Sequence, residues 1–121
     1  MTDDKTTVAR LKEEVRRFCD EREWDRYHGA KDLAIGLATE SSELLELFRF
    51  KSDEEVEAML KDPAKRGEMG EELADSLYFI LRFSQRYGFD LADEFELKMA
   101  GNEKRYPKEK SKGSNRKYTE L

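Results

Sequence analysis

Apolar residues recur every three or four positions along most of this chain, which is the pattern of amphipathic α-helices. The first such segment runs from about Thr6 to Glu23, and Asp4 or Thr6 is a suitable N-cap. Its apolar side is formed by Val8, Leu11, Val15 and Phe18. The pattern stops at Trp24, and residues 24–31 combine aromatic residues, a histidine and a glycine in what we expect to be an ordered loop.

Helical periodicity resumes after this loop, with Asp32 as the expected N-cap of a helix that ends near Phe50. Ser52 and Glu55 then have the spacing of a capping box, which predicts a short helix up to about Lys61.

A long helix is expected next, because Pro63 suits the first turn of a helix and Gly88, which follows Tyr87, suits its end. Asp90 is the expected N-cap of a last long helix. Its apolar side carries Leu91, Phe95 and Met99.

These elements predict an all-α fold: a four-helix bundle core with one short extra helix. Residues 107–121 are rich in Lys and contain no apolar residue before Tyr118, so we expect a flexible basic tail. The helical domain is accordingly assigned to residues 1–106.

Two acid-x-x-acid pairs fall within the predicted long helices: Glu40 with Glu43, and Glu72 with Asp75. Residues three apart lie on one helix face, so both carboxylates of a pair point the same way. The first pair falls among the apolar positions Leu33, Leu37, Leu44, Leu47 and Phe48. The second falls among Met69, Leu73, Leu77, Ile80 and Phe83.

Carboxylates on an apolar face lose hydration, which is costly unless a counter-charge is present. Four of them around one cavity are expected to hold a hard cation with oxygen ligands, Mg²⁺ foremost, and Mn²⁺ suits the same ligands. A chain rich in Glu also produces such pairs by chance on solvated faces. Placement on an apolar stripe in two separate helices favours the metal site.

Composition narrows the functional classes. Of the 121 residues, 42% are charged and the net charge is −5, which argues against binding a nucleic-acid polymer through its backbone. The single cysteine, Cys19, is expected to be a buried thiol. The longest apolar run, residues 77–81, is far too short to cross a membrane, and the chain starts without a secretory signal. We therefore expect a cytoplasmic protein without membrane contact.

The last predicted helix carries a polar and cationic strip at its end. Lys98, Asn102 and Tyr106 are spaced by four, with Arg105 beside them. Cations near a helix C-terminus are favourable in themselves, so the strip is either a solvated face or a contact for phosphate.

Several segments together resemble the all-α nucleoside triphosphate pyrophosphohydrolases, the MazG-like group, and within it the dCTP pyrophosphatase branch. The acid quartet, with 28 residues between its two pairs, is the central motif. The first flanking match is residues 21–28, which begin Glu-Arg-Glu-Trp where the branch has Glu-Arg-Asp-Trp, and which end in His28. The others are residues 43–50, Lys98 to Pro107 and 116–121. Phe50 and Phe79 stand where this branch often has Trp and Tyr.

The resemblance implies a Mg²⁺-dependent enzyme that cleaves a nucleoside triphosphate, with dCTP or a modified cytosine nucleotide favoured, to the monophosphate and pyrophosphate. Its implied role is to clear unwanted nucleotides, and members assemble as dimers or tetramers. It assigns Glu40, Glu43, Glu72 and Asp75 to the metal and to catalysis. It assigns Trp24, His28, Phe50, Phe79, Lys98, Asn102, Arg105 and Tyr106 to substrate binding.

Two other interpretations fit the sequence less well. A ferritin-type di-iron bundle needs Glu-x-x-His motifs, and no histidine follows any candidate Glu by three. A non-catalytic helical module that binds a nucleotide or a protein would be expected to lack an acid or the phosphate strip, and both are present.

Overall fold

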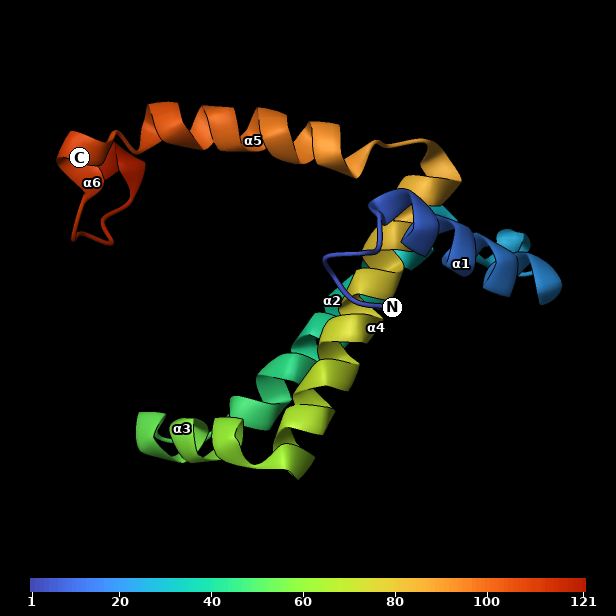
Figure 1. The fold of residues 1–121 in the computed structure, drawn as a ribbon, viewed down its shortest axis with the longest axis horizontal. Coiled ribbons are helices and arrows are strands. Elements are labelled where there is room, and N and C mark those ends of the chain that lie inside the picture. Colours follow the sequence, from blue (N-terminus) through green and yellow to red (C-terminus); the bar gives the residue numbers. More distant parts are fainter. The chain divides into compact units, whose positions relative to one another are not determined.

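The structure, a computed structural model, describes residues 1–121 and consists of helices and the segments that connect them (Figure 1). The all-α prediction is confirmed. The elements are α1 (Val8–Glu21), the 3₁₀ helix η1 (Asp25–Tyr27), α2 (Ala30–Phe48), α3 (Asp53–Lys61), α4 (Pro63–Tyr87), α5 (Leu91–Arg105), α6 (Lys108–Ser111) and the 3₁₀ helix η2 (Tyr118–Glu120).

Local sequence signals set most helix ends. Ser52 and Glu55 form the predicted capping box of α3, and Asp62 caps α4 with Pro63 in its first turn. Gly88 ends α4 in the left-handed conformation, with φ 75°, which glycine adopts without a steric penalty. Asp90 caps α5 by accepting from the backbone N–H of Asp93.

Two predicted N-caps were wrong. The N-cap of α1 is Thr7, whose hydroxyl accepts from the Arg10 backbone N–H at 3.1 Å. The N-cap of α2 is Gly29, so Asp32 lies inside the first turn. There its carboxylate still favours the helix, because the N-terminal end carries the positive pole of the helix dipole.

Residues 1–88 form one compact unit with α4 at its centre. Helices α1, α2 and α3 each pack against α4, and Figure 1 shows α2 lying alongside it. The buried apolar side chains of this unit are Val15, Cys19, Leu33, Met69 and Leu81. The buried thiol predicted for Cys19 is thus confirmed.

The apolar stripe predicted for α2 agrees with the structure: Leu33 is buried and Leu37, Leu44, Leu47 and Phe48 are half-buried. The stripe predicted for α4 was wrong for Leu73, Leu77 and Ile80, which are 57%, 42% and 38% exposed. These three share one face of α4 with buried Met69 and Ser84, so the face is covered in some places and exposed in others. Periodicity identified the apolar face but not how much of it the neighbouring helices cover.

Residues 89–121 form a second unit, which contains α5, α6 and η2. The predicted tail thus includes two short elements. Tyr118 lies edge-on to Tyr106 at 6.0 Å between ring centroids, and the Arg105 guanidinium lies 5.0 Å from the Tyr118 ring. The domain boundary at residue 106 stays a prediction. None of the helices combines the length and the apolar character that a bilayer-spanning segment requires.

One contact sets how closely α2 and α4 approach. Gly36 of α2 faces the ring of Phe79 of α4, and a Cβ at Gly36 would overlap with Cε1 and lie 2.6 Å from Cζ of that ring. Only a residue without a side chain allows this approach. Glu40 follows Gly36 by one turn, and Asp75 precedes Phe79 by one turn, so the contact is adjacent to the acid quartet.

Gly36→Ala should therefore destabilise the protein by about 1–2 kcal/mol, because overpacking outweighs the gain in helix propensity. Gly70→Ala is the matched control, since nothing lies within 4 Å of a Cβ at Gly70. This control should stabilise α4 by roughly 0.5–1 kcal/mol. Urea unfolding of the two variants measures both signs, and a stabilising Gly36→Ala would contradict the contact.

Candidate functional site

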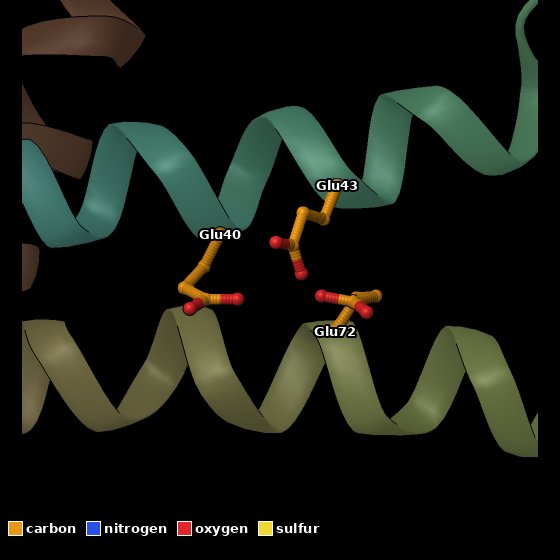
Figure 2. A group of neighbouring side chains, drawn as sticks. All are labelled: Glu40, Glu43 and Glu72. Carbon is orange, nitrogen blue, oxygen red and sulfur yellow. The ribbon is translucent and has the colours of Figure 1, made fainter.

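Three carboxylates converge between α2 and α4. Figure 2 shows Glu40 and Glu43 extending from α2 toward Glu72 on α4. One oxygen of each lies within 4.8 Å of one oxygen of each of the others. This grouping follows from the i, i+3 spacing on α2 and from the side-by-side packing of the two helices.

The three groups differ in exposure. Glu40 and Glu72 are half-buried and Glu43 is exposed. Loss of hydration raises the pKa of Glu40, and the like charges of Glu43 and Asp75 raise it further. The pKa of Glu72 is raised mainly by loss of hydration and also by its interaction with Glu43. At neutral pH the cluster is therefore a site of electrostatic strain.

Two oxygens of the cluster are left without a partner. Oε2 of Glu40 and Oε2 of Glu72 are buried and accept no hydrogen bond. Most buried polar atoms in proteins are paired, and water molecules or a cation would satisfy these two. A divalent cation with oxygen ligands fits this donor set.

Asp75, the fourth predicted ligand, is not in this group of three. It lies on α4, three residues after Glu72, and its side chain is exposed. Its charge nevertheless raises the pKa of both Glu40 and Glu72, so it contributes to the same negative field. Its role as a ligand stays a prediction.

Aromatic residues connect the predicted base-binding loop with α4. The ring of Trp24 lies edge-on to Phe18 at 5.6 Å, Phe18 lies edge-on to Tyr78 at 6.2 Å, and Tyr78 lies edge-on to Phe79 at 5.1 Å. The structure therefore joins two predicted substrate residues, Trp24 and Phe79, through one aromatic cluster that ends beside Gly36.

His28 also lies in this region, with its ring 5.8 Å from that of Trp24. Its Nδ1 accepts a hydrogen bond from Nε of Arg82 at 2.9 Å. Loss of hydration lowers the pKa of His28, and the positive charge of Arg82 lowers it further.

Phe50 is far from this cluster in its own chain. His28 precedes the start of α2 and Phe50 follows its end, and a helix of 19 residues is roughly 28 Å long. Phe50 is 89% exposed and has a left-handed backbone, with φ 64°. Its ring contacts the Arg49 guanidinium, at 4.6 Å.

The remaining predicted substrate residues lie on or just after α5, in the second unit. Lys98 is exposed, and the amide of half-buried Asn102 lies 3.9 Å from the Met99 sulfur. Arg105 and Tyr106 both contact Tyr118. Phosphate binding by these residues stays a prediction.

Sequence reasoning assigned no role to Arg82, Asp25 or Gly36. The available signals were an arginine within the apolar stretch 77–83 and a glycine in the middle of an amphipathic helix. Either feature is unfavourable without a specific partner, and each has one in the structure.

The chain is similar to several known proteins. Residues 35–121 match the MazG-like family. The chain is 38% identical over 113 residues to dCTP pyrophosphatase 1 of Bos taurus and 37% identical to that of Homo sapiens. These alignments cover 90% of the chain and 67% and 66% of the two relatives, so the chain spans about two thirds of their length.

A solved structure has a similar fold. The crystal structure of a pyrophosphatase from Archaeoglobus fulgidus is similar, with a TM-score of 0.78 and 31% sequence identity. The match covers 88% of this chain and 98% of that one.

Glu40→Gln provides a test of the carboxylate cluster. The pKa of Glu40 is raised in the folded state, so its stabilising contribution is present at low pH and is lost as pH rises through that pKa. At pH 7.5, without metal, the neutral amide should raise Tm by a few degrees. The same change should weaken Mg²⁺ binding at least about tenfold, because even outer-shell partners cost that much.

Calorimetric melting with and without Mg²⁺ measures both effects. Glu71→Gln is the matched control, because Glu71 is exposed and lies next to Glu72 in sequence. A Mg²⁺-induced shift in Tm that survives Glu40→Gln would show that the metal binds elsewhere.

Proposed function

The chain belongs to the MazG-like family, and on that premise we propose that it is a nucleotide pyrophosphohydrolase that hydrolyses a deoxynucleoside triphosphate to the monophosphate and pyrophosphate. The observation that carries this proposal is the convergence of Glu40, Glu43 and Glu72, with two buried oxygens unpaired. An acidic cluster of this kind repels a triphosphate unless cations lie between them.

Mg²⁺ is the metal we propose, with Mn²⁺ able to replace it. Glu40, Glu43, Glu72 and Asp75 would hold it through carboxylate oxygens. When bound, such an ion polarises phosphoryl oxygens, lowers the pKa of a bound water and neutralises the leaving pyrophosphate. The residues of the chain then have to position the nucleotide and orient the attacking water, which is most of the work in phosphoryl transfer.

Glu43 is the residue we assign to the attacking water. It is the exposed member of the three carboxylates, so a water molecule reaches it most easily. Lys98, Asn102, Arg105 and Tyr106 are the proposed phosphate contacts.

The proposed substrate is dCTP or a modified cytosine nucleotide, since both curated relatives compared above are named for dCTP. Trp24 offers a large aromatic surface for the base, with His28 and Phe79 in the same aromatic region. A cytoplasmic role in clearing unwanted nucleotides from the pool is the biological function that fits.

We also propose that the chain forms a homo-oligomer, a dimer or a tetramer. Leu73, Leu77 and Ile80 make an exposed apolar row on α4, and exposed apolar rows of this kind mark association surfaces. Phe50 is too far from Trp24 to reach the same base within one chain, so its substrate role requires the pocket of a second copy.

The first experiment is pyrophosphate release from a panel of canonical and modified deoxynucleoside triphosphates, with and without Mg²⁺. We expect Mg²⁺-dependent release, fastest with dCTP or a modified form of it. Glu43→Gln should lower kcat by at least about 100-fold, the scale of a lost general base, while Glu71→Gln stays near wild type.

Two results would change the proposal. If Glu43→Gln has a kcat near that of wild type with full Mg²⁺ occupancy, another acid must orient the attacking water. No release from any nucleotide would favour the alternative of a non-catalytic module that binds a nucleotide or a protein.

Light scattering after size exclusion tests the oligomer. We expect a mass that is a multiple of 14.2 kDa for wild type at micromolar concentration. Leu73→Glu should shift the protein toward the monomer, since it places a charge in the apolar row. A wild-type protein that remains monomeric over the whole concentration range would refute this proposal.

A further inference from the structure

Arg82 is an arginine whose side chain is completely enclosed. Its exposed fraction is 0%, the lowest among the charged residues of this chain. A guanidinium taken out of water is costly unless its donors are satisfied. Here Nε donates to Nδ1 of His28 at 2.9 Å, Nη1 donates to Oε1 of Gln85 at 2.6 Å, and Nη2 donates to Oδ1 of Asp25.

Two of these three partners belong to the loop that carries Trp24. Asp25 follows Trp24 directly, and His28 is the C-cap of η1. The Tyr87 hydroxyl adds a hydrogen bond to the His28 carbonyl at 3.3 Å. Arg82 and Tyr87 are both on α4, so this helix holds the loop at both ends of η1.

The contact with Arg82 also fixes the protonation of the imidazole. An arginine side chain has donors only and stays charged, so Nδ1 of His28 must be the acceptor and carries no proton. In the neutral ring the proton then sits on Nε2. Protonating Nδ1 would place two donors against each other and break this hydrogen bond.

The charges around His28 act in both directions: Arg82 and Arg86 lower its pKa, whereas Asp25 and Asp32 raise it. Arg82 and Arg86 face it from α4, Asp25 from η1 and Asp32 from α2. Loss of hydration is the largest cause of its lowered pKa and the charge of Arg82 comes next.

We propose that Arg82 is a positioning residue for the base-binding loop. Its enclosed guanidinium holds His28 as the neutral tautomer with the proton on Nε2, and through Asp25 and His28 it fixes the loop beside Trp24. The structural part of this proposal does not depend on any activity.

A consequence for specificity rests on the proposed function. A fixed Nε2–H offers one donor next to the Trp24 ring, and it therefore selects a base that presents an acceptor there. Pyrimidine carbonyl oxygens and unprotonated ring nitrogens are acceptors of this kind. Protonation of His28 would release Arg82 and loosen the loop.

The chain has one histidine and one tryptophan. The histidine ring signals in NMR spectra and the tryptophan fluorescence therefore each come from a single known residue. Long-range ¹H–¹⁵N spectra of wild type at pH 7.5 should show a protonated Nε2 and a bare Nδ1. A ring that is protonated on Nδ1, or on both nitrogens, at this pH would overturn the proposal before any variant is made.

Arg82→Met removes the donors and keeps much of the side-chain volume. We expect a mixture of His28 tautomers, a His28 pKa that rises toward about 6.5, and altered Trp24 fluorescence. The KM for the preferred nucleotide should rise about tenfold, the scale of a lost hydrogen bond to a charged group, with kcat changed less. In wild type KM should increase as pH falls through the His28 pKa, and in the variant this increase should be lost, because no Arg82 contact remains to be released.

Arg86→Met is the matched control. Arg86 lies one turn further along α4, and its Nε is 3.9 Å from Asp25. Substituting it therefore removes the same positive charge but leaves the hydrogen bond between Arg82 and the His28 ring in place. It should keep the tautomer and KM near wild type. Arg82→Lys, which keeps the positive charge and one donor nitrogen, serves if Arg82→Met does not fold, and should retain the wild-type tautomer in part.

The outcomes separate the two proposals. A folded Arg82→Met protein with an unchanged tautomer and unchanged KM would refute the positioning role. A changed tautomer and fluorescence in a protein that hydrolyses no nucleotide would support the positioning role while refuting the proposed function.

Discussion

The close approach of α2 and α4 is the constraint on which the site depends. Gly36 lets the ring of Phe79 lie against the backbone of α2, and the next turn of each helix carries carboxylates toward the other. With a larger residue at position 36 the helices would have to separate, and the spacing of the three carboxylates would increase with them. A packing contact thereby sets the geometry of a charged cluster.

This arrangement exchanges stability for a binding site. Glu40 and Glu72 are deprived of water and face like charges, which raises the pKa of both. A protein optimised for stability alone would replace such groups with apolar residues. Keeping them, with one oxygen of each buried and unpaired, fits a site that could hold a cation between the carboxylates.

The sequence predicted what is decided locally. The capping box at Ser52, the glycine stop at Gly88 and the acid pairs on one helix face all depend on residues within a few positions of each other. The exposure of Leu73 and Leu77 depends instead on which neighbours cover α4, and periodicity carries no such information. The sequence left open whether Phe50 and Trp24 reach a pocket of their own chain or of a neighbouring copy, because a family motif gives the order of residues and not whether one chain or two supplies them.

Two kinds of buried charge in this molecule show how structure separates roles that sequence leaves alike. Glu72 and Arg82 are both charged residues of α4. The donors of Arg82 meet three partners within the protein. The buried guanidinium therefore needs no partner from outside, and it holds other residues in place. Glu72 retains a buried oxygen with no partner, so its enclosure is incomplete until something from outside the chain arrives. A buried charge that is fully paired positions other residues, and one that is left unpaired marks where a ligand is to bind.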